Sequence, residues 1–165
     1  MSIEQDLELI KQHWGSENSL NVFLDAEVRR LCPLICGSDA PLPRVQLVPT
    51  FMEGGLLGGT RRGGEYEPHD GNFPATVSIL PSMATDKASV TRVLAHELVH
   101  HWEHLRARGV SALTYPAHAD GVIAARFRHS GRESRWRGGH SRDFIAKLHA
   151  VGQTLGEDLR ELLFS

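Results

Sequence analysis

The stretch from Asp86 to Arg108 constrains the fold most, because it contains neither glycine nor proline. Apolar side chains recur within it at Val90, Leu94, Leu98, Trp102 and Leu105. This spacing places them along one face of an α-helix. Thr85 or Asp86 can cap the first turn. We therefore predict one long helix whose apolar stripe packs on a sheet.

The same helix carries the sequence His96-Glu97-Leu98-Val99-His100. Residues four apart lie about 40° from each other around a helix and one turn apart along it. The imidazoles of His96 and His100 can therefore reach one metal ion at a Zn–N distance of about 2.0–2.1 Å. Glu97 can reach a water on that ion and act as a general base, whereas Leu98 points the opposite way. The alternative is a pair of surface histidines on an amphipathic helix.

A catalytic zinc ion needs a third protein ligand, because it takes three such ligands and a water. His101 lies about 140° around the helix from His96, and His104 lies about 12 Å along the axis, so neither fits. His104 is expected to face solvent or to support the ligands from behind. The remaining candidates lie later in the sequence, at His118, His129, Glu133, His140 and His149.

His140 is the preferred third ligand among these candidates. It follows Gly138 and Gly139, which allow a close approach of the backbone, and it precedes a predicted helix. Packing of Phe144 on that helix would hold the imidazole in place. His149 lies nine residues further on and is expected at the surface or in the core.

The rest of the chain predicts short strands and further helices. Two helices are expected over residues 1–32, interrupted at Gly15 and ended by Pro33. Strands are predicted at Arg44–Val48, Gly54–Thr60 and Ala75–Leu80. Residues 63–74 are expected to form a polar loop, and two more helices follow residue 139. The fold class is therefore α+β, with a small, mostly antiparallel sheet packed on the long helix.

Composition excludes several classes of protein. The chain has 165 residues, of which 41% are hydrophobic and 23% charged, and this balance is typical of a single globular domain. No apolar run is long enough to span a membrane, and the acidic N-terminus does not resemble a signal peptide. Cys32 and Cys36 are the only cysteines, which favours free thiols in a reducing compartment. We therefore expect a cytoplasmic protein.

The spacing of the histidines resembles that of a known family. His96-Glu97-Leu98-Val99-His100 is followed by Gly139-His140-Ser141-Arg142-Asp143-Phe144. This combination is similar to the SprT-like (Spartan-like) zinc metallopeptidases, in which a third histidine opens a later helix in a Gly-His-Gly-x-x-Phe-type motif. The resemblance covers roughly residues 43–152. Ser141 stands where that family usually has glycine, and the family's common four-cysteine zinc ribbon is absent from this sequence.

The resemblance implies a zincin-like fold and a zinc-dependent peptidase. Residues 1–165 would form one metallopeptidase domain, with a family-like core at about 43–152 and N-terminal helices over 1–32. His96, His100 and His140 would bind Zn²⁺, and Glu97 would be the catalytic residue. The substrate would be a protein or peptide. A non-catalytic module stabilised by zinc is the alternative, and Glu97 separates the two because a structural site has no need of it.

A basic segment precedes and includes the start of the last long helix. Between Arg126 and Arg142 lie six arginines and one acid, Glu133. Such a concentration of charge suits either a solvated loop or a contact surface for nucleic acid. The family resemblance favours DNA as the partner, and a DNA-associated scaffold is a further alternative. No membrane partner is expected.

Overall fold

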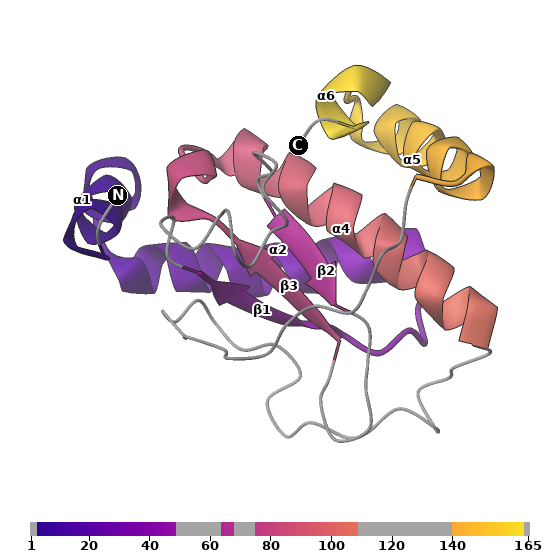
Figure 1. The fold of residues 1–165 in the computed structure, drawn as a ribbon, viewed down its shortest axis with the longest axis horizontal. Coiled ribbons are helices and arrows are strands. Elements are labelled where there is room, and N and C mark those ends of the chain that lie inside the picture. Colours follow the sequence, from indigo (N-terminus) through magenta and orange to yellow (C-terminus); the bar gives the residue numbers. More distant parts are fainter. Residues whose placement is uncertain (1–2, 49–63, 68–74, 109–139, 164–165) are drawn as a thin grey trace.

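The computed structural model describes residues 3–48, 64–67, 75–108 and 140–163. These residues form helices around a small three-stranded sheet, which confirms the α+β class. Figure 1 shows the sheet beside the long helix α4 (Lys87–Arg108), with α5 (Arg142–Leu155) and α6 (Leu159–Leu163) beyond α4 on the side away from the strands. Within the described residues, no helix is long and apolar enough to cross a membrane.

The two N-terminal helices are α1 (Ile3–Trp14) and α2 (Glu17–Cys36). Ser16 caps α2, because its side chain accepts a hydrogen bond from the backbone N–H of Ser19 at 3.1 Å. The prediction that Pro33 ends this helix is wrong, since the helix continues for another turn. A proline removes one backbone hydrogen bond, but burial of Cys32 and Ile35 on either side of it favours the helical path.

The sheet consists of β1 (Arg44–Leu47), β2 (Gly64–Glu67) and β3 (Thr76–Ile79) in the order β1-β3-β2. β1 pairs with β3 in parallel, and β2 pairs with β3 antiparallel. The expectation of a mostly antiparallel sheet is therefore wrong for one of the two pairs. A parallel pair requires a long connection between its strands, and residues 48–75 provide it.

The strand predictions have three different outcomes. The strands at Arg44–Val48 and Ala75–Leu80 are confirmed as β1 and β3. The polar loop expected at residues 63–74 is wrong at its start, where β2 forms. The predicted strand at Gly54–Thr60 lies outside the described residues.

The core lies where α2, α4 and the sheet meet. The short 3-10 helix η2 (Pro81–Met83) leads from β3 into α4. Asp86 starts α4, because its carboxylate accepts hydrogen bonds from the backbone N–H and the hydroxyl of Ser89. The predicted apolar face is buried at Val90, Leu94 and Leu98, all fully inaccessible to solvent. The half-buried Trp102 packs against this core.

Both cysteines are free thiols, as the sequence predicts. They lie one turn apart on α2, with Cys32 buried and Cys36 half-buried. The Cys36 thiol donates to the backbone carbonyl of Leu98 at 3.3 Å. A hydrogen bond with Cys32, together with burial, raises the pKa of the Cys36 thiol well above its usual range. The Cys36 thiol therefore stays protonated, and its hydrogen bond to Leu98 ties α2 to α4.

Candidate metal centre

Two of the predicted ligands lie on the buried face of α4. His96 and His100 are 5% and 6% exposed, and their ring centroids are 5.2 Å apart. Glu97, between them in sequence, is 4% exposed. The apolar side chains on the opposite side of α4 are packed in the core, and this packing sets the orientation of the helix about its own axis. The polar side chains therefore point toward α5 and β2. The long helix predicted from the sequence thus has a separate core face and a polar face.

His140 reaches the same place from the beginning of α5. It immediately precedes Ser141, whose side chain caps α5 by accepting from the backbone N–H of Phe144 at 3.1 Å. The Ser141 hydroxyl also donates to Glu103 on α4 at 2.5 Å. One side chain therefore begins α5 and ties that helix to α4. Ser141, the departure from the family pattern, has a structural role directly beside His140.

The three histidines form a group that could hold a metal ion. One ring nitrogen from each of His96, His100 and His140 lies within 4.8 Å of the others. The Nε2 atoms of His96 and His140 are 3.2 Å apart. Tetrahedral zinc with Zn–N bonds of about 2.0–2.1 Å places its ligand nitrogens about 3.3–3.4 Å apart. The spacing of this pair therefore fits one shared ion.

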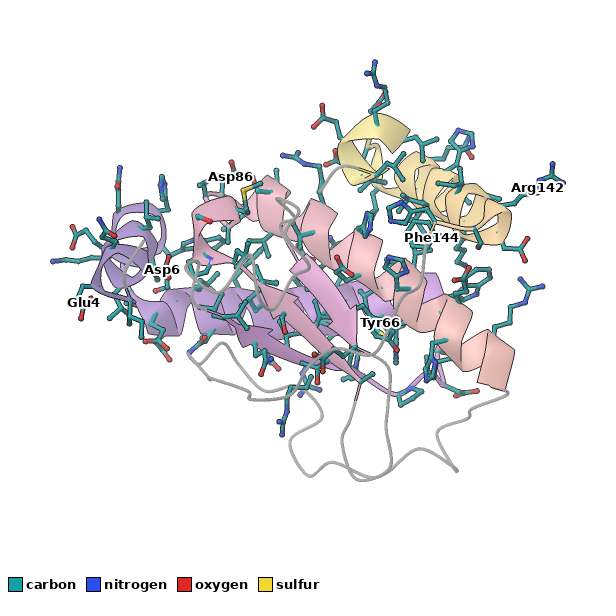
Figure 2. All side chains as sticks on the ribbon, viewed as in Figure 1. Glu4, Asp6, Tyr66, Asp86, Arg142 and Phe144 are labelled. Atoms are coloured by element: carbon teal, nitrogen blue, oxygen red, sulfur yellow. The ribbon has the colours of Figure 1, made fainter. Side chains whose placement is uncertain are left out.

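Phe144 packs against all three imidazoles. Its ring stacks on those of His100 and His140, with centroids 4.3 and 4.6 Å apart, and meets His96 edge-on at 5.2 Å. Phe144 is fully buried, and Figure 2 shows it in the space between α5 and α4. The packing role expected for this residue is confirmed. It extends beyond anchoring α5, since the ring packs against the imidazoles of His96, His100 and His140 and limits their rotation.

A backbone carbonyl of α6 fixes the ring of His96. The Nδ1 atom of His96 lies 2.7 Å from the carbonyl oxygen of Leu162. A carbonyl oxygen can only accept, so Nδ1 carries the proton in the neutral ring. The Nε2 atom then has its lone pair available toward His140 and the centre of the cluster. Nothing in the sequence pattern around Leu162 indicates this contact.

Glu97 lies beside the first residue of β2. A Cβ atom added at Gly64 would lie 3.3 Å from Cγ of Glu97 and 2.7 Å from Cγ1 of Val93. The absence of a side chain at Gly64 therefore lets the strand approach α4 closely next to this carboxylate. Glu97 is thus buried between α4 and β2.

His101 and His104 do not join the cluster, as the helix geometry predicts. Nε2 of His101 lies 2.7 Å from the carbonyl oxygen of Pro41, and Nδ1 lies 2.8 Å from the Tyr66 hydroxyl. The imidazole therefore donates to Pro41 and accepts from Tyr66. Burial lowers the pKa of His101 to about 4, which keeps the ring neutral. The solvent-facing position expected for His104 is wrong, because that side chain is only 4% exposed.

Tyr66 was missed because it falls in the stretch predicted to be a polar loop. It is 1% exposed, and its ring lies parallel to that of His100 with centroids 6.4 Å apart. Its side chain lies between β2 and α4 in Figure 2. The alternation of Gly64, Glu65, Tyr66 and Glu67 is a weak strand signal, and the neighbouring glycines and prolines obscure it.

The other candidate ligands are not part of the described cluster. His149 lies on α5 but is exposed, as expected for a residue nine positions from His140. Three further candidates, His118, His129 and Glu133, lie outside the described residues. The basic segment also lies outside them, except for its last residues. Arg142 is exposed at the first position of α5 and points away from α4 in Figure 2.

Comparison with known proteins adds no relative. No protein-family model, curated protein or solved structure matches this chain. The residues themselves therefore define the class of site. It is a three-histidine group that could bind a metal ion, with a buried carboxylate adjacent in the helix.

Proposed function

We propose that this protein is a zinc-dependent metallopeptidase similar to the SprT-like family. The observation that carries the proposal is the convergence of His96, His100 and His140, with Glu97 next to the first ligand on the same helix. Three neutral imidazoles are a ligand set that suits zinc and leaves a fourth position for water. Zinc held there would lower the pKa of a coordinated water toward 7 and polarise a substrate carbonyl.

Glu97 would act as the general base in this mechanism. Its carboxylate would accept a proton from the attacking water and return it to the leaving amine, so that the peptide bond breaks without net proton loss. Burial of Glu97 beside β2 restricts its rotamers, which favours a fixed base over a mobile one. A structural zinc site gains nothing from an acid at this position.

A substrate has room along the same face of α4. A cavity of about 550 Å³ lies toward the beginning of that helix, between α4 and α6. It is lined by Met83, Ser89, Arg92, Val93, Asp158, Arg160 and Glu161. Arg92 and Val93 lie one helical turn before His96 and Glu97, whereas the described residues that line the cavity include none of the candidate ligands. The cavity would receive a part of the substrate remote from the bond that is cleaved.

Strand addition would hold the substrate backbone at a sheet edge. Among the described strands β3 cannot provide that edge, because it is the central strand and both its sides are paired. Of the described strands, β2 is the edge strand next to Glu97. We therefore assign substrate alignment to the β2 side of the sheet.

Metal content tests the ligand set. We expect one zinc per chain in the purified protein and loss of tightly bound zinc in His140→Ala. His149→Ala is the matched control, because it removes an exposed imidazole from the same helix. Full zinc retention in His140→Ala, together with loss in His118→Ala or Glu133→Ala, would show that the third ligand is wrong.

Hydrolysis of an unfolded protein substrate tests the reaction. Glu97→Gln should keep zinc and fold while lowering the rate by about 10²–10⁴-fold or more, as expected for loss of a general base. Glu8→Gln makes the same change in charge at an exposed position of α1 and should leave the rate unchanged. Equal activity in wild type and Glu97→Gln would reject the mechanism. Zinc binding without any hydrolysis would favour the zinc-stabilised module.

A further inference from the structure

The backbone carbonyl of Leu162 lies deep in the structure and faces a candidate metal ligand. Leu162 is fully buried and belongs to the last turn of α6, where helix carbonyls lack partners within the helix. Its oxygen is 2.7 Å from Nδ1 of His96, 66 residues earlier in the chain. The end of α6 thus makes a direct hydrogen bond to the ring of His96.

This contact determines which ring nitrogen faces the cluster. Because the carbonyl only accepts, the neutral His96 ring must carry its proton on Nδ1. Nε2 of His96 then carries a lone pair, and it lies 3.2 Å from Nε2 of His140. His96 therefore already has the protonation pattern that a metal requires at Nε2.

We propose that the Leu162 carbonyl is a positioning group that locks His96 in the Nδ1-protonated tautomer and so presents Nε2 to the metal. The inference rests on the proposed role of His96 as a ligand. Outer partners of this kind orient a ligating imidazole, raise its basicity and typically contribute 10–100-fold to metal affinity. The metal affinity of this protein therefore depends on where α6 sits.

The packing of α6 on α5 fixes the position of this carbonyl. A Cβ atom added at Gly152 on α5 would lie 2.7 Å from the backbone oxygen of Glu157 and 3.1 Å from Cδ1 of Leu162. Backbone cannot yield as a flexible side chain does, so Gly152→Ala must push the α6 segment away from α5. Alanine is the better helix former, so α5 itself gains helix propensity from the change. The variant therefore displaces the turn at Glu157, which bonds the Gly152 carbonyl at the end of α5 and leads into α6.

The test is the tautomer of His96, read from nitrogen chemical shifts of ¹⁵N-histidine-labelled, metal-free protein. His96→Asn identifies the signal. Wild type should show His96 protonated on Nδ1. A wild-type spectrum with the proton on Nε2 of His96 would overturn the proposal directly. This measurement needs neither bound metal nor activity, so its failure is distinguishable from failure of the proposed peptidase function.

The displaced variant tests whether the tautomer matters for metal binding. Gly152→Ala should lose the Nδ1-protonated signal and bind Zn²⁺ about 10–100-fold more weakly in competition with a chromophoric chelator. Gln153→Ala, an exposed change at the next position of α5, should alter neither property. If Gly152→Ala changes the tautomer but leaves the affinity unchanged, the positioning role is wrong. If Gly152→Ala does not fold, the wild-type tautomer still decides whether the carbonyl sets the proton position.

Discussion

Replacement of Phe144 should weaken metal binding beyond its effect on stability. Phe144 is fully buried, and truncation of such a residue to alanine typically costs about 3–5 kcal/mol of folding free energy. Its ring also contacts three imidazoles at centroid distances of 4.3–5.2 Å. Each aromatic pair contributes about 0.5–1.5 kcal/mol beyond buried area. If half of that orienting energy, about 0.75–2.25 kcal/mol over the three pairs, acts on the ligands, the metal affinity of Phe144→Ala falls about 4–40-fold.

Leu148→Ala is the matched control for this prediction. Leu148 lies one turn further along α5, is also fully buried, and its truncation costs a similar 2–5 kcal/mol. Urea unfolding of the metal-free proteins should show comparable losses for the two variants, while chelator competition should show weakened Zn²⁺ binding only for Phe144→Ala. Phe144→Leu keeps an apolar side chain without the stacking, and should lose affinity with a smaller stability cost. Equal affinities for Phe144→Ala and Leu148→Ala would refute the reasoning.

Two further predictions concern β2 and His101. Gly64→Ala should lower the free energy of unfolding by about 1–3 kcal/mol and slow hydrolysis without loss of zinc, because the new Cβ lies 2.7 Å from Val93 and displaces β2 from Glu97. Adding Val93→Ala should restore part of the stability and part of the hydrolysis rate. If neither is restored, the contact with Val93 is not the cause of the loss. In metal-free protein, His101 binds a proton more readily unfolded, at a pKa near 6.5, than folded, at about 4. Its stabilising contribution is therefore complete above pH 6.5 and decreases by about 3 kcal/mol as the pH falls to 4. Urea unfolding between pH 4 and 6.5 should show that the free energy of unfolding depends less on pH in His101→Phe than in the control His13→Ala, which removes an exposed histidine. Equal pH dependence in the two variants would contradict the lowered pKa of His101.

Local patterns were sufficient to predict most of the helices and the two candidate ligands on α4, His96 and His100. The uninterrupted helical period of α4, the cap at Asp86 and the Gly15 interruption are all properties of neighbouring residues. The spacing of His96 and His100 follows from helix geometry in the same way. Predictions that depended on a single strong signal were less secure. Pro33 is a helix-breaking signal, but the apolar residues on either side of it keep the chain helical to Cys36.

Features that depend on distant parts of the chain could not be predicted. The parallel pairing of β1 with β3 depends on how the chain connects the two strands, and no residue pattern within either strand indicates it. Every residue has a backbone carbonyl, so the sequence does not indicate that the one at Leu162 contacts His96. Tyr66 meets His101 across 35 residues, within a segment whose composition suggests a loop. The convergence of His140 with α4 was predicted from a motif, whereas the contacts that enforce it were not.

The four histidines of α4 lie in two pairs on different sides of the helix. His96 and His100 face the cluster, while His101 and His104 lie on another side of the helix and are equally buried. A ligand pair on a helix is useful only if the helix cannot rotate or slide, since a small displacement moves both nitrogens together. His101 resists that motion by bonding Pro41 before β1 and Tyr66 on β2, which are separate segments of the chain. The neutral His101 ring thus ties α4 to two separate segments of the chain, next to the helix turn that carries His96 and His100.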